Sequence, residues 1–193
     1  MTIGQVFKRT GSATVLAALL SAPGLVNAQL LGVSAAPNPA VGGAPLALDV
    51  LISGVTDLYG YQFSLAFNPA VLQVTGATEG AFLPTAGATV FDGGTVNNVL
   101  GTLTFAFGSL TGPVPGASGS GALARINFSV TRVGSSNLTF SDVLLIDSSL
   151  GTLPVQVSNA LINAVPEPGT YALFALGLAG LSGLAVWRQR KAG

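Results

Sequence analysis

The sequence predicts an all-β domain built as a sandwich of two sheets. Apolar and small or polar residues alternate through most of the middle of the chain, which is the period of a half-buried strand. Gly, Asn, Asp, Ser and Pro interrupt this alternation at short intervals. No stretch between residues 29 and 165 has a convincing helical period. About nine short strands, each with one apolar face, favour two packed sheets.

The first 28 residues have the layout of a secretory signal peptide. Lys8 and Arg9 precede an apolar run at 13–20, which is too short to span a ~30 Å bilayer core. Pro23 breaks this run before a stretch of small residues that ends at Ala28. We therefore expect cleavage between Ala28 and Gln29, so that the mature protein begins near Gln29.

The clearest strand of the middle region is 59–67, in which every odd position is large and apolar and every even position is small or polar. Asn68 and Pro69 end it with turn chemistry. The other strands are expected at 46–52, 72–74, 103–107, 126–130, 138–140, 143–145, 155–157 and 161–162, and residues 29–35 could add a short edge strand. The domain therefore extends from residue 29 to residue 165.

The C-terminal end, residues 166–193, combines three features. Pro166, Glu167 and Pro168 form an extended segment, because each proline denies the preceding residue a helical backbone. The 19 uncharged residues that run from Gly169 to Trp187 rise about 28 Å as a helix, enough to cross the hydrocarbon core. The basic residues that hold the tail on the cytoplasmic side of the membrane follow this helix; they are Arg188, Arg190 and Lys191.

This three-part end resembles the PEP-CTERM sorting signal. The resemblance implies that an exosortase, a membrane-embedded transpeptidase-like enzyme of Gram-negative bacteria, cleaves the chain near Pro-Glu-Pro. The protein would then pass from a transient membrane anchor to the cell surface or the extracellular matrix. The alternative is an ordinary single-span anchor that stays in place.

The composition excludes several functions. The domain has six acidic residues but only two basic ones, Arg125 and Arg132, so it cannot neutralise a run of phosphates and we expect no nucleic-acid partner. The chain has no Cys and no His, which removes disulfides, thiolate nucleophiles and imidazole bases. The acidic residues are scattered, and no pair is forced together as glycoside hydrolysis requires. We therefore expect no enzymatic activity, no catalytic residues and no cofactor.

Calcium is the one metal left open, although no metal site is assigned. Asp57, Asp92, Asn97 and Asn98 lie in turn-rich segments, where their side-chain oxygens could converge on a hard cation. Loop Asp and Asn residues more often cap turns.

Two segments of the domain resemble cohesin domains. Residues 63–74 read as an aromatic strand that runs into Asn68-Pro69-Ala70-Val71-Leu72 and a short following strand. Residues 121–130 resemble the cohesin strand that starts at Gly and ends in a Phe-rich segment, and the later strands keep the family's order. The resemblance implies a nine-stranded jelly-roll sandwich, an architecture shared with several carbohydrate-binding modules.

The same resemblance implies a module for protein–protein interaction or scaffolding. In cellulosomal cohesins a sheet face that includes the aromatic strand binds a dockerin. Gly60 and Gln62 fall where dockerin-binding members carry Asn and Asp, so this candidate partner face has lost charge and hydrogen-bonding groups. Binding of carbohydrate or exopolysaccharide is the alternative, although Tyr59 and Tyr61 share the core side of Phe63 and the domain has no Trp. A structural matrix component without a defined ligand is a third possibility.

Overall fold

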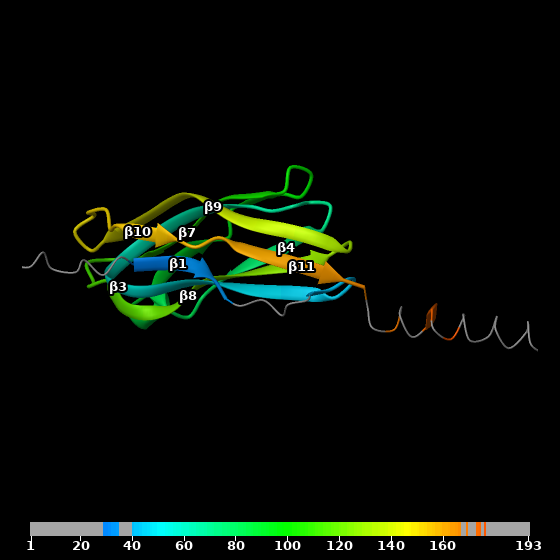
Figure 1. Cartoon of the computed structure of the whole chain (residues 1–193). Helices are drawn as coiled ribbons and strands as arrows, with labels where there is room; N and C mark the ends of the chain where they lie inside the picture. The colour runs from blue at the N-terminus through cyan, green and yellow to red at the C-terminus, as the bar shows by residue number, and fades with distance from the viewer. Residues whose placement is uncertain (1–28, 35–39, 167–168, 170–172, 175, 177–193) are drawn as a thin grey trace, which may run out of the picture.

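The computed structural model describes residues 29–34, 40–166, 169, 173, 174 and 176. Within these ranges the chain is mostly β-strand with almost no helix, which confirms the all-β prediction (Figure 1). The strands are β1 (Gln29–Val33), β2 (Ala40–Val41), β3 (Pro45–Ala66), β4 (Leu72–Glu79), β5 (Thr89–Asp92), β6 (Thr95–Asn97), β7 (Thr102–Leu110), β8 (Ala117–Val130), β9 (Gly134–Asp147), β10 (Val155–Val157) and β11 (Ala160–Val165). A 3-10 turn, η1 (Leu83–Thr85), lies between β4 and β5.

The long strand β3 belongs to both layers of the sandwich. Its first part pairs with β1 and β8, and β10 and β4 lie outside these two strands. Its last part pairs with β7 and β9; β5 and β6 flank β7, whereas β11 and then β2 follow β9. Gly54 (φ 69°) and Asp57 (φ 59°) take left-handed conformations at the change of layer, where the pairing register with β8 also shifts. Two strands expected at 46–52 and 59–67 are therefore one continuous bent strand.

The expected edge strand at 29–35 is β1, but it does not lie at an edge. The three residues of β10 pair with it in parallel and cover it. The additional short strands β2, β5 and β6 lie in segments where the sequence has little alternation.

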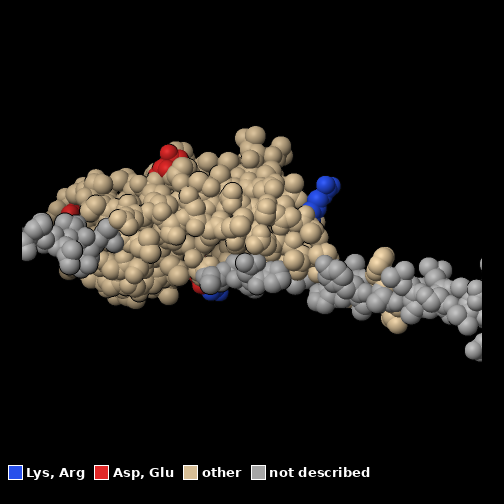
Figure 2. All heavy atoms as spheres, viewed as in Figure 1, with Lys and Arg blue, Asp and Glu red and all other residues tan. Residues whose placement is uncertain are grey.

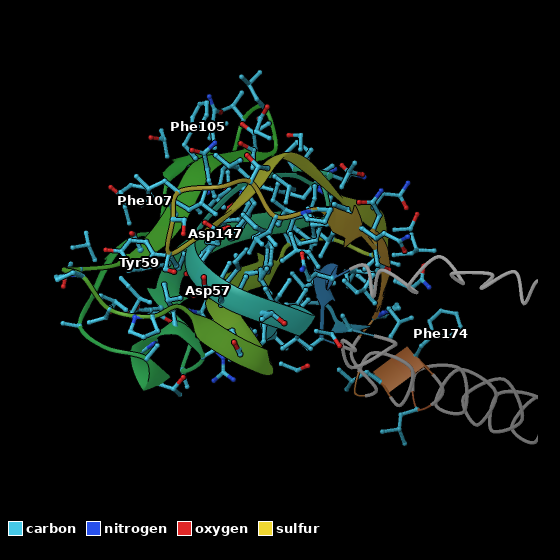
Figure 3. All side chains as sticks on the ribbon, turned by 90° about the vertical axis from the view of Figure 1, so that its left-hand side faces the viewer. Asp57, Tyr59, Phe105, Phe107, Asp147 and Phe174 are labelled. Atoms are coloured by element: carbon cyan, nitrogen blue, oxygen red, sulfur yellow. The ribbon has the colours of Figure 1, made fainter. Side chains whose placement is uncertain are left out.

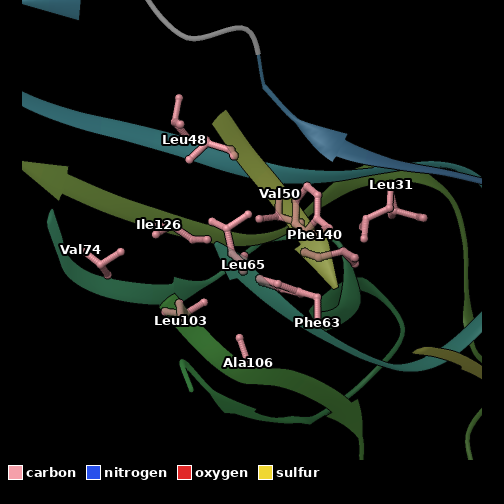
Figure 4. Packing of buried hydrophobic residues seen from close by; sticks show 14 of the residues in the cluster. Leu31, Leu48, Val50, Phe63, Leu65, Val74, Leu103, Ala106, Ile126 and Phe140 are labelled. Carbon is pink, nitrogen blue, oxygen red and sulfur yellow. The ribbon is translucent and has the colours of Figure 1, made fainter. Parts of the chain in front are cut away.

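The core lies between the two layers (Figure 4). Phe63 of β3 contacts Phe140 of β9 edge to face, with 5.7 Å between the ring centroids. Phe67 contacts Phe128 of β8 in the same way at 5.8 Å. Each buried side chain of this size stabilises the fold by about 1.5–3 kcal/mol, and each aromatic pair adds about 0.5–1.5 kcal/mol.

The predicted corner at Asn68 is also present. Its Oδ1 accepts a hydrogen bond from the N–H of Ala70 (3.1 Å), and its Nδ2 donates to the carbonyl of Ser135 (3.1 Å). The buried Ser136 hydroxyl accepts the Asn68 N–H at 2.9 Å. Asn68 thus holds the turn after β3 against the start of β9.

Candidate functional site

The outward side of β3, β7 and β9 forms an apolar face. Tyr61, Phe63 and Leu65 of β3 are buried, so the alternating positions Gly60 and Gln62 point away from the core. We define the Gln62 face as the outward residues of these three strands, which are Gly60, Gln62, Phe105, Phe107, Leu144 and Ile146. The sequence analysis singled out Gly60 and Gln62, and the structure places both at the centre of this face.

Gln62 lies between two exposed apolar side chains. Its register partners are Phe107 on β7 and Leu144 on β9, which are 38% and 42% exposed. Figure 3 shows Phe107 on the same side of the domain as Phe105, which is 59% exposed. Formal charges on the surface visible in Figure 2 are few and scattered. Beside the Gln62 face, the exposed Asp92 of β5 is the register partner of Phe107. The Gln62 face therefore offers apolar contact area with one carboxylate at its border.

A hollow of about 170 Å³ lies at the position of Gly60. A Cβ at Gly60 would come within 3.2 Å of the Cδ1 and Cγ1 atoms of Ile146. Phe107, Leu144 and Ile146 line the hollow. Its volume is about six times the ~30 Å³ that one water occupies in the liquid, which is enough for an apolar side chain.

On each of the two strands that flank Ser64, one residue has a positive φ angle. Phe105 on β7 has φ 55° and Asp142 on β9 has φ 50°, and the register of each strand against β3 shifts there. A bulky residue in this region is a conformational outlier, at a cost of roughly 1–3 kcal/mol. The buried Ser64 hydroxyl accepts the Phe105 N–H at 3.2 Å. These bulges place strained backbone within the apolar face.

The bulge at Phe105 corrects one part of the sequence analysis. Alternation through 103–107 places Leu103, Phe105 and Phe107 on one face. In the structure Leu103 and Ala106 are fully buried, whereas both phenylalanines are exposed. One extra residue in a strand reverses the direction of all later side chains, and a bulge at a non-glycine residue has no reliable sequence signal. Leu144 and Ile146 were not identified from the sequence either, because residues 143–146 are all apolar and their pattern does not show which side chains are exposed.

A second, larger hollow of about 540 Å³ lies at the end of the sandwich. Tyr59, Pro113, Pro115, Ser148 and Leu150 are among its lining residues. The expectation that both tyrosines are core residues holds for Tyr61, which is 4% exposed. Tyr59 is only half-buried, and its hydroxyl donates to the carbonyl of Gly112 at 2.7 Å.

The carboxylate of Asp57 holds together the loops beside this hollow. It accepts hydrogen bonds from the Ser148 hydroxyl (2.7 Å) and the Gly116 N–H (2.6 Å). These two donors, the Ser148 hydroxyl first, hold the pKa of Asp57 below its ordinary value. Asp147 lies nearby in Figure 3 and accepts the N–H groups of Ser149 and Gly151 within its own turn.

The residues considered for calcium serve separate local roles. Asp92 accepts the N–H of Gly94, and Asn97 accepts those of Val99 and Leu100. Asn98 exchanges two hydrogen bonds with the backbone of Val74. Across the described ranges, no three acidic side chains gather as a metal site would require.

The opposite sheet carries an ion pair. Both Nε and Nη2 of Arg125 donate to the carboxylate of Asp49, at 2.6 and 2.9 Å. The hydrogen bonds from Arg125 hold the pKa of Asp49 below its ordinary value. Burial, and secondarily the carboxylate of Glu79, raises the pKa of Tyr61, whose hydroxyl donates to the carbonyl of Leu123. Asp49, Glu79 and Arg125 also line a hollow of about 290 Å³ on this sheet.

The described strands begin at Gln29 and end at Val165. Gln29 begins β1, is 8% exposed and has a buried Oε1 atom without a hydrogen-bond partner. β11 ends at Val165, directly before Pro166. Gly169 is described as an exposed helical residue. The remaining predicted end residues lie outside the described ranges; they are Ala28, Glu167, Pro168, Trp187, Arg188, Arg190 and Lys191.

The few helical residues described after the domain are apolar and exposed. Leu173, Phe174 and Leu176 are 68–72% exposed. A search of the described part of the chain for a helix of membrane-spanning length and hydropathy finds none. Most of the predicted span lies outside that part.

Comparison with protein families gives two matches. The cohesin domain family model matches residues 33–163. The PEP-CTERM protein-sorting motif matches residues 164–191. No curated protein matches the sequence.

Solved structures of cohesins share the fold. A non-cellulosomal cohesin from Archaeoglobus fulgidus has a TM-score of 0.56 at 17% identity, over 75% of this chain and 96% of that one. The second type II cohesin module of an Acetivibrio cellulolyticus adaptor scaffoldin has a TM-score of 0.58 at 19% identity, over 72% and 91%. A cohesin module from a Clostridium perfringens family 33 glycoside hydrolase has a TM-score of 0.58 at 11% identity, over 71% and 98%. At these identities the likeness shows the fold alone.

Proposed function

The chain belongs to the cohesin domain family, and from this premise we propose that it is a non-enzymatic, exported protein whose sandwich binds a protein partner through the Gln62 face. Cohesins are non-catalytic interaction modules, and the PEP-CTERM motif implies export to the cell surface or beyond. The proposal concerns which face binds, what kind of partner it accepts and how the chain is released.

The observation that carries the binding proposal is the pair of exposed apolar side chains on either side of Gln62. Phe107 and Leu144 flank a hollow of about 170 Å³, and Phe105 extends the same face. Aromatic residues around a hollow are typical of the energetic centre of a protein interface. The strained bulge at Phe105 supports this assignment, because costly backbone conformations cluster at functional sites.

The chemistry of this face indicates an apolar partner. Gly60 and Gln62 replace the Asn and Asp that dockerin-binding relatives carry, so a partner gains little from matching charges at these two positions. A partner that inserts one aliphatic or aromatic side chain over Gly60 would bury Phe107 and Leu144. The proposed partner is therefore an extracellular protein with an apolar contact surface, different from a dockerin in its recognition chemistry.

A capture experiment tests this proposal. The mature protein recovered from the medium is immobilised, and culture extracts are passed over it. We expect one protein to bind saturably to the wild type and to be lost in the Phe107→Ser/Leu144→Ser variant. Leu51→Ser is the matched control, because Leu51 is 37% exposed and belongs to the part of β3 in the other sheet. Equal binding by all three forms contradicts the assignment of the Gln62 face.

The second part of the proposal is that an exosortase cleaves the chain near Pro166 and releases it. The exposed apolar residues Leu173 and Phe174 support an anchor that requires lipid around it before cleavage. The sequence further predicts that signal peptidase cuts between Ala28 and Gln29.

Intact-mass analysis tests both cleavages. Protein recovered from the medium or the outer surface should begin near Gln29 and end near Pro166. Recovery with Arg190 and Lys191 still attached would contradict processing and favour a permanent anchor. Glu167→Gln should leave membrane insertion unchanged, because the apolar helix drives it, but should block sorting.

Carbohydrate binding is a second candidate, favoured by one observation. Tyr59 is half-buried and lines the open hollow of about 540 Å³, and an aromatic ring that lines a hollow can stack on a sugar face. A glycan array probed with the mature protein would detect such binding, and Tyr59→Leu should abolish it. Binding that survives Tyr59→Leu would exclude this hollow as the sugar site.

A further inference from the structure

We propose that the processing enzyme binds the sorting segment as a continuation of β11, and that β2 must first leave the edge of β11. This inference rests on the proposed processing of the chain. The surface assigned to the enzyme is the backbone edge of Ala164 and Val165, and its partner is an extended segment of the enzyme that replaces β2.

The sorting segment begins without any linker after the folded domain. β11 ends at Val165 and Pro166 follows at once. Ile162 and Ala164 are 2% and 4% exposed, so β11 is part of the core up to its penultimate residue. The enzyme therefore meets a substrate whose upstream residues already belong to a sheet.

Strand β2 holds the last residue of β11. On the side of β9, the register of β11 ends at the pair Ala164 and Gly134. Among the described residues, Val165 pairs only with Val41 of β2, and its carbonyl accepts the N–H of Gly42 at 2.8 Å. Release of β2 would free this carbonyl while the pairing with β9 stays intact.

A processing enzyme needs this edge. Enzymes that cut a peptide chain usually bind it extended, with hydrogen bonds to its backbone on both sides of the cleaved bond. Pro166 has no N–H to offer, so Val165 is the nearest upstream residue with a complete backbone. β2 occupies the edge that such an enzyme would use.

The geometry makes β2 the segment that gives way. It has two residues, against five register pairs between β9 and β11. Ala40 of β2 contributes only one methyl group to the core. The N–H of Gly43 remains bonded to the carbonyl of Val130 at 2.9 Å, and this bond anchors the turn about which β2 opens.

A disulfide between β2 and β11 tests the proposal in a chain that contains no Cys. Ala40 and Ala164 are register partners on neighbouring strands, whose separation of about 4.8 Å suits a disulfide. In the oxidising periplasm we expect the Ala40→Cys/Ala164→Cys variant to accumulate uncleaved, and a reductant to restore cleavage. The readout is the ratio of full-length to processed chain over time.

The matched control places the same crosslink away from the sorting segment. Leu30 and Ser53 are register partners between β1 and β3, and both are exposed. The Leu30→Cys/Ser53→Cys variant should be processed at the wild-type rate. The comparison distinguishes the effect of fixing β2 to β11 from a general effect of disulfides on export.

A second pair of variants tests whether processing becomes faster when the pairing of β2 with β11 is weakened. Gly42→Pro removes the N–H that donates to Val165, whereas Gly42→Ala keeps it and places a Cβ at an ordinary 3.4 Å from the same carbonyl. We expect Gly42→Pro to speed processing about fivefold, the factor that one backbone hydrogen bond supplies. Gly42→Ala should match the wild type.

The outcomes are distinguishable. If the wild-type chain is never cleaved, the proposed processing itself fails. If the wild type is cleaved, and the oxidised Ala40→Cys/Ala164→Cys variant is cleaved equally fast, the enzyme does not need the edge of β11 and the inference is overturned. Slower cleavage that a reductant reverses, together with faster cleavage of Gly42→Pro, supports it.

Discussion

The backbone N–H of Phe105 on β7 donates to the hydroxyl of Ser64 on β3 across 3.2 Å, with Phe105 held at a positive φ of 55°. This contact fixes the bulge that turns the Phe105 side chain into solvent. Ser64 is only 4% exposed, so the bond is shielded from water. The Ser64 hydroxyl thus supports the exposure of Phe105 on the Gln62 face.

Replacing Phe105 with glycine tests whether the backbone of Phe105 is strained. We expect Phe105→Gly to leave the free energy of unfolding within about 1 kcal/mol of the wild type, because relief of strain offsets the added chain entropy. Phe107→Gly, two residues further along β7, relieves no such strain and should lose about 1–2 kcal/mol. Urea denaturation of both variants measures this difference, and equal losses would show that Phe105 is unstrained.

Filling the hollow at Gly60 should impair partner binding without unfolding the domain. In Gly60→Ala the new Cβ meets the flexible end of Ile146 at 3.2 Å, so the side chain must shift by a few tenths of an ångström. We expect the dissociation constant of the captured partner to rise at least tenfold, or about 1.4 kcal/mol. Gly76→Ala on β4 is the control, because nothing lies within 4 Å of its Cβ. Unchanged affinity in Gly60→Ala would place the contact elsewhere.

The stability of the domain should fall in acid through Asp57. Its folded-state pKa is lowered, so its contribution is present above the ordinary carboxyl pKa near 4 and is lost as the pH falls through the folded value. We expect Asp57→Asn to be less stable than the wild type at neutral pH and to lose less on acidification below about pH 4. The urea midpoint measured from pH 7 to pH 2 shows both effects.

Ser148→Ala provides the matched variant for this prediction. It removes the hydroxyl that contributes most to the lowered pKa of Asp57 but keeps the Gly116 N–H. The decrease of its urea midpoint between pH 7 and pH 2 should lie between those of the wild type and Asp57→Asn. A decrease equal to that of the wild type would mean that the Ser148 hydroxyl has no influence on the titration of Asp57.

The corner after β3 should depend on the Asn68 side chain. Asn68→Ala removes its hydrogen bonds with Ala70 and Ser135 and should cost about 1–2 kcal/mol. The exposed Asn137 serves as the control, and Asn137→Ala should change the unfolding free energy by less than about 0.5 kcal/mol. Calorimetry or urea denaturation measures both, and equal effects would remove the special role of Asn68.

Much of the molecule follows from the order of its residues. Alternation at 59–67 identifies the buried side of β3, because the side-chain period of a strand is two and needs no knowledge of its neighbours. Asn68 and Pro69 predict the corner, because the turn preference of both residues depends only on the local backbone. The sorting segment is readable for the same reason, since a long apolar run bounded by prolines and basic residues is a local pattern.

Only the tertiary structure decided the functional face. Gly60 and Gln62 were visible in the sequence, but the exposure of Phe105 and Phe107 depends on a bulge that Ser64 stabilises from another strand. The pairing of β2 with the last residues of β11 joins segments more than a hundred positions apart. Such contacts depend on strand register across the whole sandwich, which a local pattern does not encode. The sequence thus determined the kind of domain and its sorting signal, and long-range pairing decided which side chains face a partner and what covers the sorting site.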